Sequence, residues 1–342
     1  MRSISLSDSA QNRSTEGYVY NSYGKIDYLK HVLASVYSLR RHDQKRQIAL
    51  FCDQHHESIL REHNLLSWFD VVEPLGPAHR SIIGFKHNVE KYMPFGANLF
   101  LDSDIIWCKN PDELWKSFST YSFTITGHLK SDIFFGSHKD FRVLSDVLLN
   151  RRRKTLKRFG LTYLSRVQSG MIYAGNFDTA KSVCELANMY MQSKDDTHFR
   201  SRILPDGSTE ESDEWGFAMA MSRLSLPVIP WYQGSRSPQL DFIRSYVRFD
   251  PEFRDVHYLY YNSQLMNDLR GIKSDKIRNF ISRSMHLFPG MNDHTWVTPF
   301  SLHFGWKHEK VPFESFAQKV WRRITANTNI STAKSANESS SE

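Results

Sequence analysis

An apolar run in the first third of the chain ends directly in two carboxylates, and this junction constrains the fold more than any other feature. The run is Ala97-Asn-Leu-Phe-Leu101, and Asp102-Ser-Asp104 follows it without a spacer. A strand that lacks polar alternation at its end is typical of a sheet covered on both faces. In open α/β sheets, ligands bind beyond the carboxyl ends of the strands. The junction therefore predicts a buried strand whose end carries acidic residues at a binding site.

Strand-like and helix-like segments alternate before this junction. Short β-branched and aromatic runs are typical of strands, and apolar residues spaced three or four apart indicate helices. The expected strands span 17–22, 47–52, 69–73 and 97–101, and the expected helices span about 26–37, 55–63 and 85–92. This alternation predicts an α/β fold with a mainly parallel sheet.

The rest of the chain is less regular. A strand is expected at 170–174 and an acidic helix start near Ser208. The segments 1–16 and 325–342 are polar, and we expect both to be flexible. Between them we expect a single large domain over residues 17–324.

Composition limits the location of the protein. With 342 residues, 40% of them hydrophobic, the chain can bury a large core. It lacks a run of about 18 apolar residues and an apolar signal sequence at its start. Its three cysteines are too few and too scattered for a disulfide framework. These features favour a cytoplasmic protein.

Positive charge is concentrated in one segment. The net charge is +7, and Arg151–Arg158 holds six basic residues of eight. The segment fits a solvated helix face, or a contact with anionic lipid that would hold the protein at the inner face of the membrane. It also fits a phosphorylated acceptor. A basic nucleic-acid-binding protein is a further alternative, but no recognised binding motif accompanies the charge, so we expect no nucleic-acid partner.

The acidic pair suits a divalent cation. Carboxylates at i and i+2 just past a strand can turn to the same side, and Mg²⁺ or Mn²⁺ accepts such oxygen ligands while leaving positions for phosphate. The cation would neutralise the charge that develops on a leaving diphosphate. The plainer interpretation is that an Asp after a strand forms a turn or caps a helix.

The residues around the acidic pair resemble a known family. The stretch from Pro94 to Trp107, followed by Pro111-Asp-Glu-Leu-Trp115, is similar to the metal-binding segment of GT-A glycosyltransferases, in particular family-8-like members that use nucleotide-diphosphate sugars. Further segments resemble the family's in the same order: Tyr18-Val-Tyr-Asn-Ser22, Gln168-Ser-Gly-Met-Ile-Tyr173, Ser212-Asp-Glu-Trp-Gly-Phe-Ala-Met-Ala220 and Leu302-His-Phe-Gly-Trp-Lys307.

The resemblance implies a GT-A (Rossmann-like) fold, with a central, mostly parallel sheet flanked by helices. Residues 17–130 would form a half that binds nucleotide and metal, and residues 131–324 a half that faces the acceptor. The implied reaction moves a hexose from a nucleotide-diphosphate sugar, UDP-hexose first, to a glycan, lipid-linked or protein acceptor, with Mn²⁺ or Mg²⁺. The donor sugar, the acceptor, retention or inversion, and the oligomeric state stay open.

The resemblance also assigns site residues by position. Asp102, Asp104 and His303 would hold the metal, with His286 and His294 as alternatives to His303. The donor nucleotide would meet Tyr18, Tyr20, Asn21, Lys86, Asp102, Ser103, Asp104 and Lys307. Ser169, Gly170 and Trp306 would lie by the sugar or acceptor.

Asp213 and Glu214 are the candidate catalytic residues. Either could accept a proton from an acceptor hydroxyl or stabilise a cationic sugar-like transition state. Their structural alternative is a helix start, in which Ser208 and Glu211 would form a capping box.

One enzymatic rival remains at this point. A phosphatase of the haloacid dehalogenase type could use Asp102 as nucleophile and Asp104 as acid and base. That motif would be expected nearer the start of the fold, with Thr or Val at position 106, where this chain has Ile106.

Overall fold

The fold is taken from a computed structural model, which describes residues 16–129, 148–203, 209–263, 266, 274–285, 287, 288, 290 and 293–338. The first half contains β1 (Glu16–Ser22), α1 (Ile26–Leu39), β2 (Gln47–Cys52), α2 (Gln54–Glu62), β3 (Val71–Pro74), α3 (Ile82–Lys86), β4 (Ala97–Leu101), β5 (Ile105–Trp107), α4 (Asp112–Phe118) and β6 (Phe123–His128).

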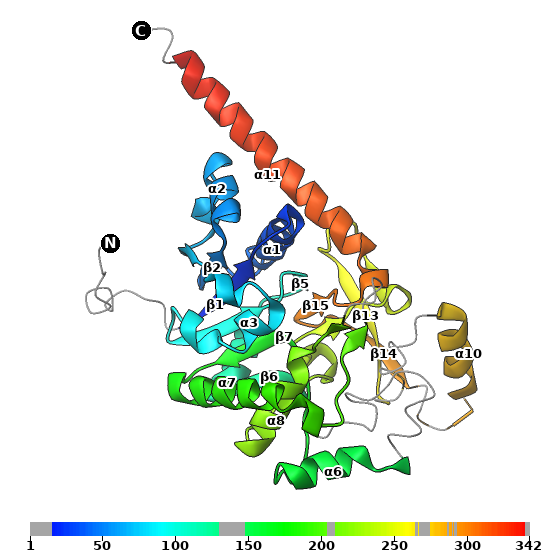
Figure 1. Ribbon diagram of the computed structural model, residues 1–342. Helices are drawn as coiled ribbons and strands as arrows, with labels where there is room; N and C mark the ends of the chain where they lie inside the picture. The colour runs from blue at the N-terminus through cyan, green and yellow to red at the C-terminus, as the bar shows by residue number, and fades with distance from the viewer. Residues whose placement is uncertain are drawn as a thin grey trace.

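The second half contains more helix at its start and short strands near its end (Figure 1). Its elements are α6 (Arg151–Arg158), β7 (Arg166–Ala174), α7 (Phe177–Gln192), β8 (Arg202–Ile203), β9 (Thr209–Glu210), α8 (Asp213–Arg223), β10 (Ile229–Pro230), β11 (Leu240–Asp241), β12 (Val247–Phe249), β13 (Val256–Tyr261), α10 (Asp275–Met285), β14 (His294–Val297), β15 (Ser301–His303) and α11 (Val311–Glu338). Short 3-10 turns include η3 (Val89–Tyr92) and η8 (Lys307–Glu309).

A seven-stranded sheet forms the centre, in the order β10-β6-β7-β4-β1-β2-β3. Its pairs are parallel except those of β7, which runs antiparallel to both β4 and β6. The α/β class and the mostly parallel sheet expected from the sequence are therefore confirmed. β4 lies in the middle of the sheet, so the acidic residues that follow it stand at the centre of the carboxyl edge.

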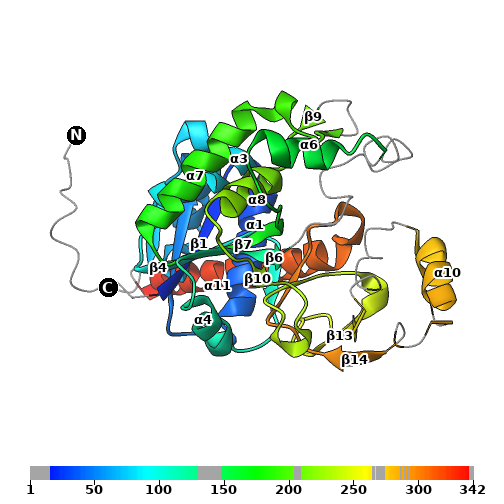
Figure 2. The same ribbon diagram turned by 90° about the horizontal axis from the view of Figure 1, so that it is seen from below.

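The sheet is buried on both faces because alternate residues of its strands point to opposite sides. Leu99 and Leu101 of β4 pack in the core that includes α1, α4 and α11, whereas Phe100 packs in the core that includes α7 and α8. Figure 2 shows α7 and α8 together on one side of the sheet. This double covering explains the apolar run that precedes Asp102.

A second, three-stranded sheet has the order β11-β15-β5. β5 follows the turn at 102–104, and β15 pairs with it in antiparallel register, with His303 opposite Ile105. β11 pairs with the other edge of β15, with Asp241 opposite His303. This small sheet therefore brings the late part of the chain against the end of β4.

Two local expectations differ from the structure. The helix expected at 85–92 is split into α3 and η3 around His87, whose buried ring donates through Nε2 to the backbone oxygen of Asp213 (2.9 Å). The helix expected from about Ser208 begins at Asp213 with Ser212 as its N-cap, and Ser208 lies outside the described residues. The segment 325–338 continues α11.

No helix among the described residues has the length and apolarity needed to cross a membrane.

Tyr18 and Tyr20 are core residues, which corrects their expected place at the nucleotide. Both side chains are fully buried. The Tyr18 hydroxyl donates to Asp43 (2.7 Å) and accepts from the Trp115 indole (2.8 Å). The Tyr20 hydroxyl lies 3.0 Å from the Ser35 hydroxyl. They face the α1 side of the sheet, so they fix β1 and do not line the carboxyl edge.

Tyr18→Phe is expected to lower the free energy of unfolding by about 1–3 kcal/mol, because two buried groups lose their hydrogen-bond partner. Tyr28→Phe, at a half-exposed tyrosine of α1, is the matched control and should change it by less than about 0.5 kcal/mol. Urea unfolding of the two variants checks the difference, and equal stabilities would contradict the buried hydrogen-bond network.

Candidate metal and donor site

The site begins where β4 ends. The backbone N–H of Asp102 donates to the carbonyl of Gly170 on β7 (2.9 Å), which holds the chain at the sheet edge as it turns into β5. Asp104 is buried, whereas Asp102 is partly exposed. The two carboxylates therefore lie at the same edge of the sheet, with Asp104 buried and Asp102 facing solvent. Ser103, between them, is partly exposed.

His303 lies against both carboxylates. Its Nε2 is 3.6 Å from an oxygen of Asp102 and 3.5 Å from an oxygen of Asp104. The three ligand atoms all lie within 4.8 Å of one another. In the part of the chain that the structure describes, this is the one group of three such side chains close enough to share a metal ion.

Asp241 orients the imidazole from behind. His303 donates through Nδ1 to Asp241 (3.0 Å), and the indole N–H of Trp306 donates to the other oxygen of Asp241 (3.2 Å). A carboxylate on one ring nitrogen fixes the ring and leaves the other nitrogen for a metal, an arrangement common in metalloproteins. Asp241 is therefore a positioning residue for His303.

The charges at this place shift the pKa values of His303 and Asp104. Burial alone would lower the pKa of His303, but its hydrogen bonds with Asp102 and Asp241 raise that pKa to about 10. Burial alone would raise the pKa of Asp104, but the charges of His303 and Lys310 lower that pKa to about 2. The imidazole is thus protonated beside the ionised Asp104 carboxylate. A divalent cation would replace this proton, and two carboxylates with one imidazole suit Mn²⁺ or Mg²⁺.

Lys86, at the end of α3, joins two parts of the site. Its Nζ is 2.7 Å from Asp102 and 3.6 Å from Asp213, and it donates to the Ser169 hydroxyl (3.1 Å). Burial alone would lower the pKa of Lys86, but the charges of Asp102 and Asp213 raise it instead. The structure therefore brings together four residues that the sequence analysis singled out.

Asp213 is buried at the first position of α8, and Glu214 follows it, partly exposed. The Ser212 hydroxyl donates to Glu214 (3.4 Å). Both carboxylates occupy the first turn of a helix, where negative charge is favoured, but the contact with Lys86 also ties Asp213 to the metal cluster.

Lys310, which the sequence analysis did not single out, is the late lysine that contacts the acidic pair, whereas Lys307 does not contact it in the structure. Lys310 Nζ donates to Asp104 (2.7 Å), whereas Lys307 is exposed on η8. The irregular turn between β15 and α11 places the later lysine inward.

The structure also shows where most of the other residues singled out from the sequence lie. A side chain at Gly170 would lie 3.0 Å from Gln239 and 3.1 Å from Gln168, so two amide side chains approach this glycine closely. Asn21 is partly exposed near the carboxyl end of β1. His294 is exposed on β14, and His286 lies outside the described residues.

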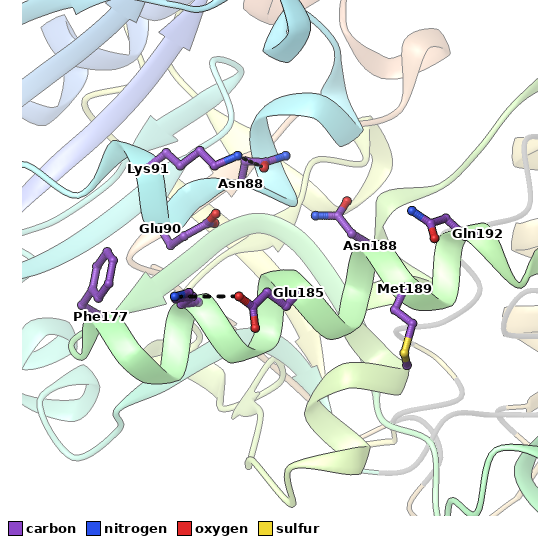
Figure 3. Close-up of a pocket in the computed structure, with 9 residues that line it drawn as sticks. Asn88, Glu90, Lys91, Phe177, Glu185, Asn188, Met189 and Gln192 are labelled. Atoms are coloured by element: carbon purple, nitrogen blue, oxygen red, sulfur yellow. Dashed lines mark hydrogen bonds and ion pairs between the residues drawn. The ribbon is translucent and has the colours of Figure 1, made fainter.

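A separate open pocket lies between α7 and η3 (Figure 3). Both of its lysines have partners nearby: Lys91 donates to Asn88 (2.7 Å), and Lys181 lies 3.9 Å from Glu185. None of the metal-cluster residues lines it. The chemistry of the acidic cluster therefore identifies the functional site better than this pocket does.

No protein-family model matches the chain, and no curated protein sequence matches it. Solved structures do resemble it. The galactosyltransferase LgtC, in complex with donor and acceptor sugar analogues, is 11% identical, with 90% of this chain and 99% of that chain covered and a TM-score of 0.46. The glycosyltransferase GlyE of Streptococcus pneumoniae is 12% identical, with 93% of this chain and 64% of that chain covered and a TM-score of 0.47.

Mouse xyloside xylosyltransferase 1 is 13% identical, with 66% of this chain and 88% of that chain covered and a TM-score of 0.42. These structures are glycosyltransferases, the class that the sequence motifs resemble. Likeness at this level leaves the activity to be inferred from the site itself.

His303→Gln is expected to weaken Mn²⁺ binding about tenfold or more, because the ring nitrogen that faces both carboxylates is lost. His294→Gln, on exposed β14, is the control and should bind Mn²⁺ as the unaltered chain does. Electron paramagnetic resonance of free Mn²⁺ in a titration measures both affinities. Unchanged affinity in His303→Gln would remove this histidine from the metal site.

Proposed function

We propose that the chain is a metal-dependent glycosyltransferase that moves a hexose from a nucleotide-diphosphate sugar, with UDP-sugars as the first donors to test, to an acceptor hydroxyl on a glycan, lipid or protein. The observation that carries the proposal is the convergence of Asp102, Asp104 and His303 at the carboxyl edge of the sheet. The two lysines that contact this pair of carboxylates add positive charge where a diphosphate would bind.

Asp102, Asp104 and His303 would hold the cation. When bound, Mn²⁺ or Mg²⁺ neutralises charge on the leaving diphosphate. Lys86 and Lys310 each contact one of the two carboxylates, so both ammonium groups lie beside the metal position. Preorganised cations of this kind favour a state in which negative charge develops on the leaving group.

Asp213 shares the Lys86 ammonium with Asp102, because Lys86 Nζ lies 3.6 Å from Asp213 and 2.7 Å from Asp102. A carboxylate so placed would face the sugar that leaves the diphosphate. In the proposal, Asp213 or Glu214 either stabilises the positive charge of the sugar-like transition state or takes the proton of the acceptor hydroxyl. Ser169, held by Lys86, lines the same region.

Incubation of the chain with a panel of sugar nucleotides tests this function. Slow hydrolysis of one of them that requires Mn²⁺ or Mg²⁺ is the expected result. Asp104→Asn should reduce the rate by at least about a hundredfold, because an amide cannot neutralise the cation. Asp178→Asn, at an exposed position of α7, is the control and should keep full activity. Hydrolysis that does not require a metal, or full activity in Asp104→Asn, would contradict the proposed function.

The two late lysines form a second, matched test. Lys310→Ala is expected to raise KM for the sugar nucleotide about 10- to 100-fold, the effect of losing a charged hydrogen bond. Lys307→Ala should leave KM unchanged, since Lys307 is exposed. Steady-state hydrolysis at saturating metal gives both values. A larger effect from Lys307 than from Lys310 would contradict the placement of the diphosphate.

A further inference from the structure

The helix α10 and the residues just after it expose an unusual amount of apolar surface. Ile277 and Phe280 on the helix are 53% and 71% exposed, and Leu287 and Phe288 beyond it are 84% and 55% exposed. Single exposed apolar residues are ordinary, but several close together indicate an interaction surface. Figures 1 and 2 both show α10 at the periphery of the molecule.

The opposite face of α10 is firmly attached, so the exposed face has a fixed orientation. Arg278 is fully buried and donates to the Ser245 hydroxyl (3.1 Å), with its guanidinium 3.8 Å from Glu309. Ile281 and Met285 pack against the main core. These contacts fix the rotation of the helix, so Ile277 and Phe280 point outward.

Charge indicates what this face would meet. Lys276 and Arg283 are exposed on the same helix as Ile277 and Phe280, and the whole chain carries a net charge of +7. Exposed aromatic and aliphatic side chains combined with basic residues are typical of helices that lie in the interface of an anionic membrane.

The strand β14 also carries an exposed aromatic side chain. Trp296 on β14 is exposed, and the Arg248 guanidinium lies 4.1 Å from its ring centroid. Both views place β14 and α10 toward the same end of the molecule (Figures 1 and 2). Tryptophan is favoured at the interface between membrane and water, and an arginine side chain can lie along apolar surface with its charged end in water.

We propose that α10, with Leu287 and Phe288, is a lipid-docking surface that inserts its apolar side chains into an anionic membrane. The surface is distinct from Arg151–Arg158, whose helix α6 has a buried Thr155 and an ion pair between Arg158 and Asp196 (2.5 Å). The proposal goes beyond the glycosyltransferase function and does not depend on it.

The docking surface also lies close in structure to the metal site. Arg278 of α10 contacts Glu309, and the next residue, Lys310, donates to Asp104. Glu309 in turn accepts from the backbone N–H of Arg244 (3.1 Å). A lipid surface bound at α10 would therefore be connected to the metal cluster through one short, hydrogen-bonded segment.

Flotation of the full chain with vesicles of phosphatidylglycerol and phosphatidylcholine tests the surface. The unaltered chain should bind these vesicles and bind vesicles of phosphatidylcholine alone more weakly. The double variant Ile277→Ser/Phe280→Ser should have a partition coefficient onto the anionic vesicles at least about tenfold lower, because two apolar side chains that would insert into the membrane are lost. Phe177→Ser/Met189→Ser, which changes two comparably exposed residues of α7, should bind as the unaltered chain does.

Thermal unfolding and sugar-nucleotide hydrolysis, measured on the same variants, separate this proposal from the proposed function. Both properties should be unchanged in Ile277→Ser/Phe280→Ser. Vesicle binding that is absent in the unaltered chain, or equal in the two double variants, overturns the docking surface. So does a dimer in solution that the α10 variant dissociates without any vesicle binding, because that result makes the face a contact between copies of the chain.

Discussion

The site depends on the pairing of β15 with β5. These strands lie almost two hundred residues apart in the sequence, so the chain loses entropy when it closes the loop between them. Burial offsets this loss of entropy, since every residue of both strands is buried. Their antiparallel register sets His303 opposite Ile105, one residue after Asp104. Without this register, the imidazole would not face the two carboxylates that follow β4.

The second constraint is charge balance. Asp104, Asp213 and Asp241 are buried carboxylates, which are costly unless they are paired. Lys86, Lys310 and the protonated His303 supply the opposite charges at distances of 2.7–3.6 Å. Cationic side chains thus hold the carboxylates in place in the absence of metal. Such a preorganised set can receive a divalent cation and a diphosphate with little rearrangement.

Sequence patterns predicted the features that are local in the chain. The apolar run before Asp102 indicated a buried central strand, and the order of the later motifs led to His303 and Asp213. Sequence patterns did not show which side of a strand faces the core or how distant strands pair. Tyr18 and Tyr20 were expected at the nucleotide, but the alternation of side chains along β1 places both in the core. Asp241 and Lys310 were missed for a related reason, because only the pairing of β11 with β15 and the turn at η8 bring them to the site.

The central claim is that Asp102, Asp104 and His303 bind one divalent cation beside the donor diphosphate. Crystals of the chain soaked with Mn²⁺ and UDP, with anomalous diffraction data collected at the manganese edge, test it most directly. The account predicts an anomalous peak within bonding distance of all three side chains, with diphosphate oxygens completing the coordination and Lys86 and Lys310 close by. Ordered UDP at another position, or a manganese peak that excludes His303 and Asp104, would contradict it.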